Sequence, residues 1–251
     1  MNRIKDYKSL AVDVVGWLCR YAHDNNVDSF VVGVSGGIDS AVSSTLAVKT
    51  GKPTYLVGMP LNQAKDQETL SDAHMYWLKS NYPNVKILKA NLSETYAKLM
   101  SDLTSEFGLE YTGNPMAKAN TKSRLRMVTL YHVAANVGGI VVGTGNKVED
   151  YGVGFYTKYG DGGVDIAPIA DLYKTEVWEL GKHLGVDERI INAAPTDGLW
   201  GDSRTDEDQL GASYEQLEEA MEHGTGPAVK ILSEYNERNK HKMLPIPTFK
   251  L

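Results

Sequence analysis

Four short runs of β-branched and aliphatic residues, separated by longer helical stretches, constrain the fold of this chain more than any other feature. The runs cover Ser29–Val34, Thr54–Met59, Val85–Ala90 and Gly139–Gly143. Strands that alternate with helices of ten or more residues favour a parallel sheet with right-handed crossover connections. The sequence therefore predicts an α/β fold in which helices flank a parallel sheet.

Helices are predicted where apolar residues recur at helical spacing or where Ala, Ser and Leu are enriched. The apolar face of the first helix, which carries Trp17, suits either a core or an interface between subunits. Glycine is dense from Glu149 to Asp165 and the hydrophobic period disappears, so we expect a mobile active-site loop there. A polar stretch follows at Asp197–Leu210, and Pro245-Ile246-Pro247 excludes a helix at the tail. The predicted helices span Tyr7–His23, Asp39–Lys49, Gln67–Ser80, Ser93–Leu103, Lys118–Asn136, Lys174–Leu184 and Tyr214–Glu222.

Composition narrows the class of protein. The chain has 251 residues, enough for one large α/β domain or two small ones. Its 42% hydrophobic and 23% charged residues are ordinary for a soluble globular protein. A formal net charge of −6 does not indicate a surface for nucleic acid or anionic membranes. No apolar run approaches the roughly 20 residues that cross a bilayer, and the N-terminus is too polar for a signal peptide. We therefore expect a cytoplasmic protein.

The single cysteine, Cys19, excludes an intramolecular disulfide framework and a cysteine-based zinc site. It lies beside Trp17 and Leu18, a setting that favours a small buried hydrophobe. A catalytic thiol is the alternative, and no flanking pattern supports it.

The segment Ser35-Gly36-Gly37-Ile38-Asp39-Ser40 joins the first predicted strand to the next helix. Its glycines let backbone N–H groups approach an anion, and the first helical turn adds unpaired N–H groups and a positive dipole end. Asp39 would repel phosphates unless a cation lay between them, which favours a magnesium ligand. A tight turn whose Asp and Ser merely cap the helix is the alternative. Ligands of open parallel sheets bind beyond the carboxyl ends of strands, where Thr144-Gly145-Asn146 also falls.

The glycine-rich segment lacks the four-residue gap and the Gly-Lys-Ser/Thr ending of a Walker loop. It resembles the Ser-Gly-Gly-x-Asp-Ser loop of the N-type ATP pyrophosphatases, which include NAD, GMP and asparagine synthetases and several tRNA-modifying enzymes. In that group the loop holds the pyrophosphate part of ATP, and the bond to the α-phosphate breaks. The resemblance implies a Rossmann-like fold of the adenine nucleotide alpha hydrolase type, in a single domain over residues 1–251.

Further segments resemble the NAD synthetases in order and spacing. Phe155–Asp165 is similar to the most distinctive stretch of that family, and Val141–Thr144 with Glu149 is similar to its ATP- and metal-binding stretch. Many relatives carry Asp-His-Ala-Ala-Glu where this chain has Gly145-Asn146-Lys147-Val148-Glu149, and the following loop is one residue longer here. The resemblance implies an ammonia-dependent NAD synthetase. The other matching segments are Asn120–Met127, Leu172–Lys174, Ala194–Asp197 and His241–Lys242.

The resemblance also implies the residues of the site. Asp39, Glu149 and Lys174 would be catalytic, with Asp39 and Glu149 as magnesium ligands. Asp150 remains a competing ligand, and Arg126 competes with Arg124. The implied ATP contacts are Gly33, Val34, Ser35, Gly36, Gly37, Ile38, Asp39, Ser40, Thr144, Lys174 and Thr196. The implied contacts to deamido-NAD are Arg124, Lys158, Asp165, His241 and Lys242.

The implied reaction is a two-step amidation with ATP as co-substrate and Mg²⁺ as cofactor. The carboxylate of deamido-NAD attacks ATP and expels pyrophosphate, and ammonia then displaces AMP to give NAD. The loop from Gly152 to Gly163 would close over the adenylate. Cys19 has no amidase context, so the expected nitrogen donor is free ammonia, or else ammonia that a separate protein delivers. The family resemblance further implies a homodimer without nucleic-acid or membrane partners.

Two other hypotheses remain open. One is a different ATP pyrophosphatase, such as a GMP synthetase subunit or a tRNA-thiolating enzyme. The lone Cys19 speaks against sulfur transfer, the net charge of −6 against tRNA, and Lys158–Asp165 against a GMP synthetase. The other is a non-catalytic nucleotide-binding module, which would have no use for Asp39, Glu149 and Lys174 together.

Overall fold

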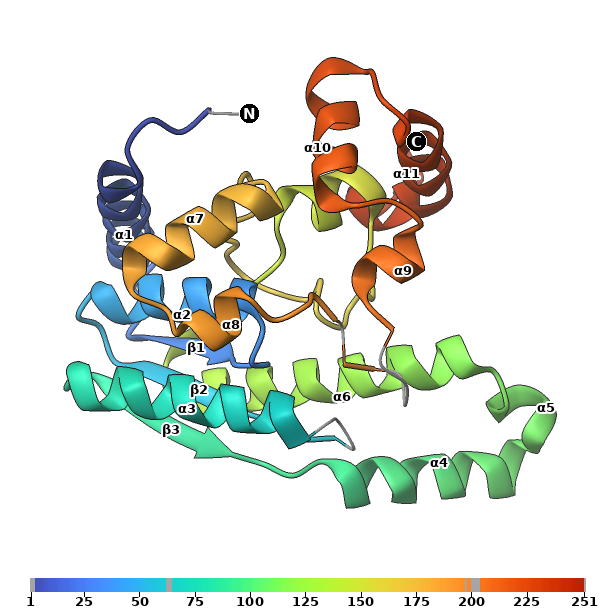
Figure 1. Cartoon of the computed structure of the whole chain (residues 1–251). Helices are drawn as coiled ribbons and strands as arrows, with labels where there is room; N and C mark the ends of the chain where they lie inside the picture. Colours follow the sequence, from blue (N-terminus) through green and yellow to red (C-terminus); the bar gives the residue numbers. More distant parts are fainter. Residues whose placement is uncertain (1–2, 62–64, 197, 200–203, 251) are drawn as a thin grey trace.

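A parallel sheet of four strands forms the centre of the computed structural model, which describes residues 3–61, 65–196, 198–199 and 204–250 (Figure 1). The strands are β1 (Ser29–Gly33), β2 (Thr54–Gly58), β3 (Val85–Lys89) and β4 (Gly139–Val142). Their order is β3-β2-β1-β4, and each neighbouring pair is parallel. The predicted α/β fold is confirmed, and all four strands lie where the apolar runs predicted them.

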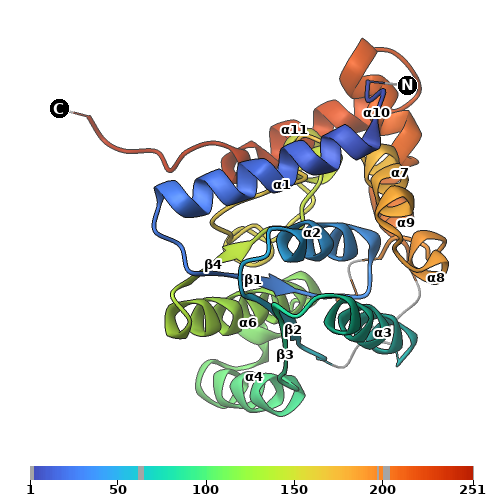
Figure 2. The same ribbon diagram turned by 90° about the vertical axis from the view of Figure 1, so that its left-hand side faces the viewer.

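Helices cover both faces of the sheet because buried residues of β1 alternate between them. Phe30 and Val32 point into a core shared with α1 (Tyr7–Asp24), α2 (Ile38–Lys49), α3 (Lys65–Asn81) and α7 (Lys174–Leu184). Val31 points to the opposite face, where α4 (Ser93–Phe107) and α6 (Pro115–Asn136) pack. Figure 2 shows these layers, with α1 outside α2 on one face and α4 outside α6 on the other.

A second, smaller core lies beyond the sheet and consists of C-terminal helices packed on the segment that follows β4. Val148 and Val153 belong to η1 (Val148–Val153), a short π-helix, and they pack with Tyr214 and Leu217 of α10 (Tyr214–His223). Helix α11 (Val229–Met243) contributes Leu232 and Tyr235. The C-terminal helices thus reach the segment that extends from the end of the sheet (Figure 1).

Several elements differ from the sequence prediction. The glycine-dense segment begins as η1 rather than as a loop, and Tyr159 adopts a positive φ of 62° within the turn that follows. Helix α4 extends to Phe107, four residues beyond its predicted end. Short helices α5 (Leu109–Thr112), α8 (Glu188–Ile191) and α9 (Asp206–Leu210) were not predicted, and neither was α11. Of the predicted polar stretch, residues 197 and 200–203 lie outside the described residues.

Two further observations bear on the predictions. Cys19 is half-buried rather than buried, with its Sγ 3.8 Å from the Thr50 carbonyl oxygen, because it lies at the edge of the apolar face of α1. Among the helices of the described residues, none combines the length and apolarity that a membrane crossing requires.

Candidate active site

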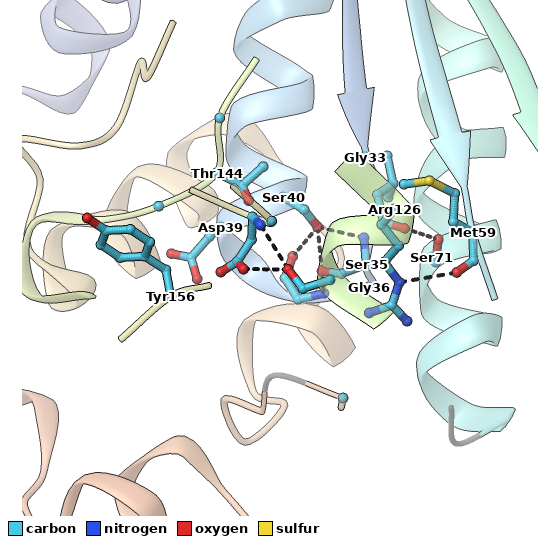
Figure 3. Close-up of a pocket in the computed structure, with 18 of the residues that line it drawn as sticks. Gly33, Ser35, Gly36, Asp39, Ser40, Met59, Ser71, Arg126, Thr144 and Tyr156 are labelled. Carbon is cyan, nitrogen blue, oxygen red and sulfur yellow. Dashed lines mark hydrogen bonds between the residues drawn. The ribbon is translucent and has the colours of Figure 1, made fainter. Parts of the chain in front are cut away.

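A cavity of about 560 Å³ opens at the carboxyl ends of β1 and β4 (Figure 3). Its wall contains every residue for which the sequence predicted an ATP or magnesium contact. These residues come from the β1–α2 loop, the segment after β4, the start of α7 and the chain before α9. They are Gly33, Val34, Ser35, Gly36, Gly37, Ile38, Asp39, Ser40, Thr144, Glu149, Lys174 and Thr196.

The glycine-rich segment is held by its own hydroxyl groups. The Ser40 Oγ accepts a hydrogen bond from the Ser35 N–H at 3.2 Å and donates to the Gly37 carbonyl at 3.0 Å. Gly36 has a φ of +96°, which a residue with a side chain rarely adopts. Gly37 is the N-cap of α2 and contributes no side-chain cap, so the first helical turn faces the cavity with unpaired N–H groups.

Asp39 does not cap this helix. Its carboxylate reaches Lys174 of α7, and the distance from Nζ to Oδ2 is 2.5 Å. The same Nζ donates to Oε1 of Glu149 on η1 at 3.1 Å. Three elements therefore bring one ammonium and two carboxylates together at the cavity wall, which counts against the simple capping turn.

Burial and charge determine the ionisation of this group. Burial raises the pKa of Asp39 to about 6, against the attraction of Lys174 and with a further rise from Glu149. Burial lowers the pKa of Lys174, but the two carboxylates outweigh it and hold that pKa above its usual value. One ammonium cannot fully neutralise two carboxylates in a site of low polarity. The group therefore retains negative charge that a further cation would offset.

Two further polar side chains lie beside this group. Asn146 is fully buried; its Nδ2 lies 3.4 Å from Asp39 Oδ1, and its Oδ1 accepts the backbone N–H of Glu149 at 3.2 Å. Asp150 also lines the cavity, and burial together with Glu149 raises its pKa to about 8. Asp150 therefore shares the cavity with Asp39 and Glu149 and stays a competing candidate for a metal ligand.

The residues predicted for deamido-NAD do not line this cavity. Lys158 Nζ donates to the carbonyl oxygen of His241 at 2.8 Å, and Arg124 Nε donates to the carbonyl oxygen of Lys158 at 3.3 Å. Lys242 Nζ donates to the carbonyl oxygens of Gly154 and Tyr156, each at 2.8 Å. These side chains tie the loop after η1 to α6 and α11.

Asp165 is the fifth residue predicted to contact deamido-NAD, and its side chain is hydrogen-bonded to strand β4 instead. Its carboxylate accepts the backbone N–H of Val141 at 2.8 Å and the Tyr131 hydroxyl at 3.0 Å. Arg126, the alternative to Arg124, does line the cavity, near Met59 and Ser71 (Figure 3). The aromatic ring of Tyr156 lies on the opposite side of the cavity.

Sequence reasoning missed Asn146 and Tyr214. The Tyr214 hydroxyl donates to Glu149 Oε1 at 2.7 Å although 65 residues separate the two. Asn146 stands in the stretch where this chain departs from Asp-His-Ala-Ala-Glu, and that departure was the available signal. No sequence pattern marked Tyr214.

The donor set fits magnesium. Magnesium in nucleotide sites is usually held by one or two carboxylates, water and phosphate oxygens. Across the described part of the chain, no group of three or more His, Cys, Asp and Glu side chains could hold a metal by itself. Asp39 and Glu149 supply two carboxylates to one cavity, so a metal there would complete its coordination with water and the phosphate oxygens of a nucleotide.

Comparisons with known proteins agree over nearly the whole chain. The profile of a family described as NAD synthase matches residues 10–244. The NH(3)-dependent NAD(+) synthetase of Carboxydothermus hydrogenoformans is 39% identical over 231 residues, which are 91% of this chain and 92% of that protein.

Two solved structures extend the likeness to three dimensions. The NMN synthetase from Francisella tularensis has a TM-score of 0.90 and 32% identity, with 99% of this chain and 100% of that chain covered. The NAD+ synthetase from Burkholderia pseudomallei has a TM-score of 0.76 and 25% identity, with 96% and 92% covered. The family profile, the sequence identity and the shared fold together show that this chain belongs to the NAD synthase family.

Proposed function

We propose that this protein catalyses the ATP-dependent amidation of a nicotinate nucleotide with ammonia and releases AMP and pyrophosphate. The observation that carries the proposal is the cavity in which the Ser35–Ser40 segment faces Asp39, Glu149 and Lys174. A loop that binds phosphates, a pair of carboxylates and a buried ammonium are the parts that adenylyl transfer requires. Membership of the NAD synthase family supports amidation as the reaction that these parts carry out.

The side chains bind and orient rather than form covalent bonds. The N–H groups at the start of α2 and the Lys174 ammonium would hold the phosphates of ATP in line with the attacking carboxylate. Asp39 and Glu149 would hold magnesium, which neutralises negative charge on the phosphates when bound. The substrate carboxylate forms the bond to the α-phosphorus as pyrophosphate leaves, and ammonia then forms the C–N bond as AMP leaves. This chemistry depends on positioning and charge stabilisation.

The loop after η1 would exclude water from the adenylate. Its turn is held by Asp161, whose Oδ1 accepts the Thr157 N–H at 3.0 Å and the Ser123 hydroxyl at 2.6 Å. Lys242 fixes the preceding carbonyls from α11. A loop held by both α6 and α11 can cover the cavity with a defined shape, which protects a hydrolysable intermediate.

The acceptor we propose is deamido-NAD, so that the product is NAD. The relative from Carboxydothermus hydrogenoformans supports this choice, since its name is that of an NAD(+) synthetase. A specific observation favours nicotinate mononucleotide as a second candidate. The NMN synthetase structure matches this chain with a TM-score of 0.90, against 0.76 for the NAD+ synthetase from Burkholderia pseudomallei.

One assay tests the function and separates the acceptors. Purified protein receives ATP, Mg²⁺ and ammonium with deamido-NAD, with nicotinate mononucleotide, or with both at equal concentration, and AMP, NAD and NMN are quantified by chromatography. We expect AMP to accumulate in equal amount with NAD and a higher kcat/KM for deamido-NAD. A higher kcat/KM for nicotinate mononucleotide would make that compound the preferred acceptor. If neither compound led to release of AMP, the proposed reaction would be refuted. Replacing ammonium by glutamine should abolish turnover.

We also propose that the protein is a homodimer. Phe107, Leu109 and Tyr111, where α4 meets α5, are 58%, 73% and 74% exposed, and such side chains are candidates for burial against a second copy. Light scattering coupled to size exclusion should give twice the chain mass. Leu109→Asp should shift the mass towards that of one chain, whereas a single-chain mass for the unmodified protein would refute the dimer.

A further inference from the structure

We propose that Tyr214 is a positioning residue of the ATP site, which orients Glu149 and Lys174 for a magnesium–nucleotide complex. The inference rests on the ATP-dependent part of the proposed function and is independent of the acceptor. Tyr214 is the first residue of α10 and is fully buried. It reaches the cavity wall from behind, through side chains that themselves face the cavity.

The two oxygens of the Glu149 carboxylate differ in their hydrogen-bond partners. Its Oε1 receives both the Tyr214 hydroxyl at 2.7 Å and Lys174 Nζ at 3.1 Å. No hydrogen bond among the described residues ends on the other oxygen, Oε2, and Glu149 lines the cavity. Two donors on Oε1 therefore leave Oε2 as the oxygen available to a cation.

Lys174 also contacts the ring of Tyr214. Its Nζ lies 4.9 Å from the centroid of the Tyr214 ring, within the range of a cation–π contact. The ring of Trp178 meets that of Tyr214 edge-on, at 6.1 Å and 80°. One phenol thus supports the ammonium with its ring and the carboxylate with its hydroxyl, and Trp178 limits how far that ring can turn.

Tyr214 is itself fixed by contacts outside the cavity. Its backbone N–H donates to Glu207 Oε1 at 3.0 Å, and Ser213 with Gln216 forms a capping box at the start of α10. Glu149, in contrast, lies on η1, and such short π-helices deviate from regular helical hydrogen bonding. Tyr214 is therefore the fixed partner, and its hydroxyl constrains the side chain of Glu149.

A competing explanation is that the hydroxyl bonds to Glu149 only because a buried phenol needs a partner. Asp206 Oδ2, at 3.5 Å, lies at the limit of hydrogen-bond distance and is the weaker partner. Both explanations predict some loss of stability when the hydroxyl is removed. Only the positioning role predicts a change in metal binding, so the test must measure metal binding directly.

The experiment compares Tyr214→Phe with the matched control Tyr235→Phe. Tyr235 packs in the same small core, and its hydroxyl donates to the Gln209 carbonyl at 2.8 Å, without contact to Glu149. Mn²⁺ binding in the presence of ATP and without acceptor is measured from the electron paramagnetic resonance signal of free Mn²⁺. Each variant is assayed well below its melting temperature, which is established by circular dichroism.

We expect Tyr214→Phe to weaken Mn²⁺ binding about tenfold, the low end of the effect of removing a hydrogen-bond partner of a metal ligand, and Tyr235→Phe to leave it within about twofold. In a Glu149→Gln background, removing the Tyr214 hydroxyl should have no further effect on Mn²⁺ binding. Unchanged binding in Tyr214→Phe, or additive losses in the double variant, would overturn the inference. These results do not depend on amidation, so a failed acceptor would leave the inference standing, whereas absent Mn²⁺–ATP binding in the unmodified protein would overturn both.

Discussion

Replacing Lys174 by methionine removes the ammonium that contacts both Asp39 and Glu149. The Lys174 side chain is 3% exposed and the two carboxylates are 17% and 16% exposed, so water can replace little of the lost attraction. Breaking a buried ion pair in this way typically costs about 3–5 kcal/mol. We expect Lys174→Met to lower the free energy of unfolding by that amount at pH 8 in the presence of EDTA.

The loss should depend on pH. Without the ammonium, the folded-state pKa of the carboxylate pair rises further above its unfolded value, so stability is retained at low pH and is lost as pH rises through the folded pKa. Burial already raises the pKa of Asp39 to about 6 in the presence of Lys174. The deficit of Lys174→Met should therefore be smaller at pH 5 than at pH 8. Added Mg²⁺ should recover part of it, because a divalent cation can take the place of the ammonium.

Lys182→Met is the matched control, since Lys182 lies on the same helix. Its pair with Glu179 is exposed, with side chains 54% and 50% accessible, and such pairs contribute about 0–1 kcal/mol. Urea unfolding followed by circular dichroism gives the free energies of all three proteins at both pH values. Equal deficits for the two variants, or a Lys174→Met deficit that does not change with pH, would refute this account of the site.

The remaining predictions concern single side chains. Burial lowers the pKa of His74 to about 4, so stability should fall by roughly 3 kcal/mol as pH falls from 6.5 to 4, and His74→Gln should flatten that part of the urea-derived profile. Asp39→Ala should lower kcat roughly 100-fold or more with an unchanged circular dichroism spectrum, and retained turnover would exclude its role as a metal ligand. Lys158→Ala should raise the KM for deamido-NAD or lower kcat, and identical kinetics would remove Lys158 from the acceptor site. Gly145→Ala places a Cβ 2.3 Å from Asp150 Oδ1, so it should cost about 1–3 kcal/mol of stability, and an unchanged melting temperature would show that the wall can yield.

The sheet was predictable because each strand is a local run of β-branched residues. Helix α11 was not, because most of its residues are polar and only a few, among them Ile231, Leu232 and Tyr235, pack against the small core. Helix α9 has only five residues, too few to show a helical period, so the capping residue Thr205 at its start was not enough to predict it. Local patterns identify elements that carry a strong period, and tertiary packing decides the others.

The candidate site also has a part that could be predicted from local sequence and a part that could not. The Ser35–Ser40 segment is contiguous, so its chemistry can be inferred from adjacent residues. Asn146 and Tyr214 act across 107 and 65 residues, and no local pattern reports such contacts. For Lys158, resemblance alone could suggest a role but could not show that its Nζ bonds to the His241 carbonyl outside the cavity.

The attachment of the loop to α11 has a consequence for the newly made chain. Asn239 donates to the Val153 carbonyl and Lys242 to that of Gly154, so these carbonyls find their partners 86 and 88 residues later in the sequence. At the usual speed of a ribosome that interval lasts on the order of ten seconds. During it the sheet and the Ser35–Ser40 segment are complete, while the loop has only its contacts to α6. The nascent protein therefore acquires its Ser35–Ser40 turn first, and the loop is held from both sides only once one of the last helices has been made.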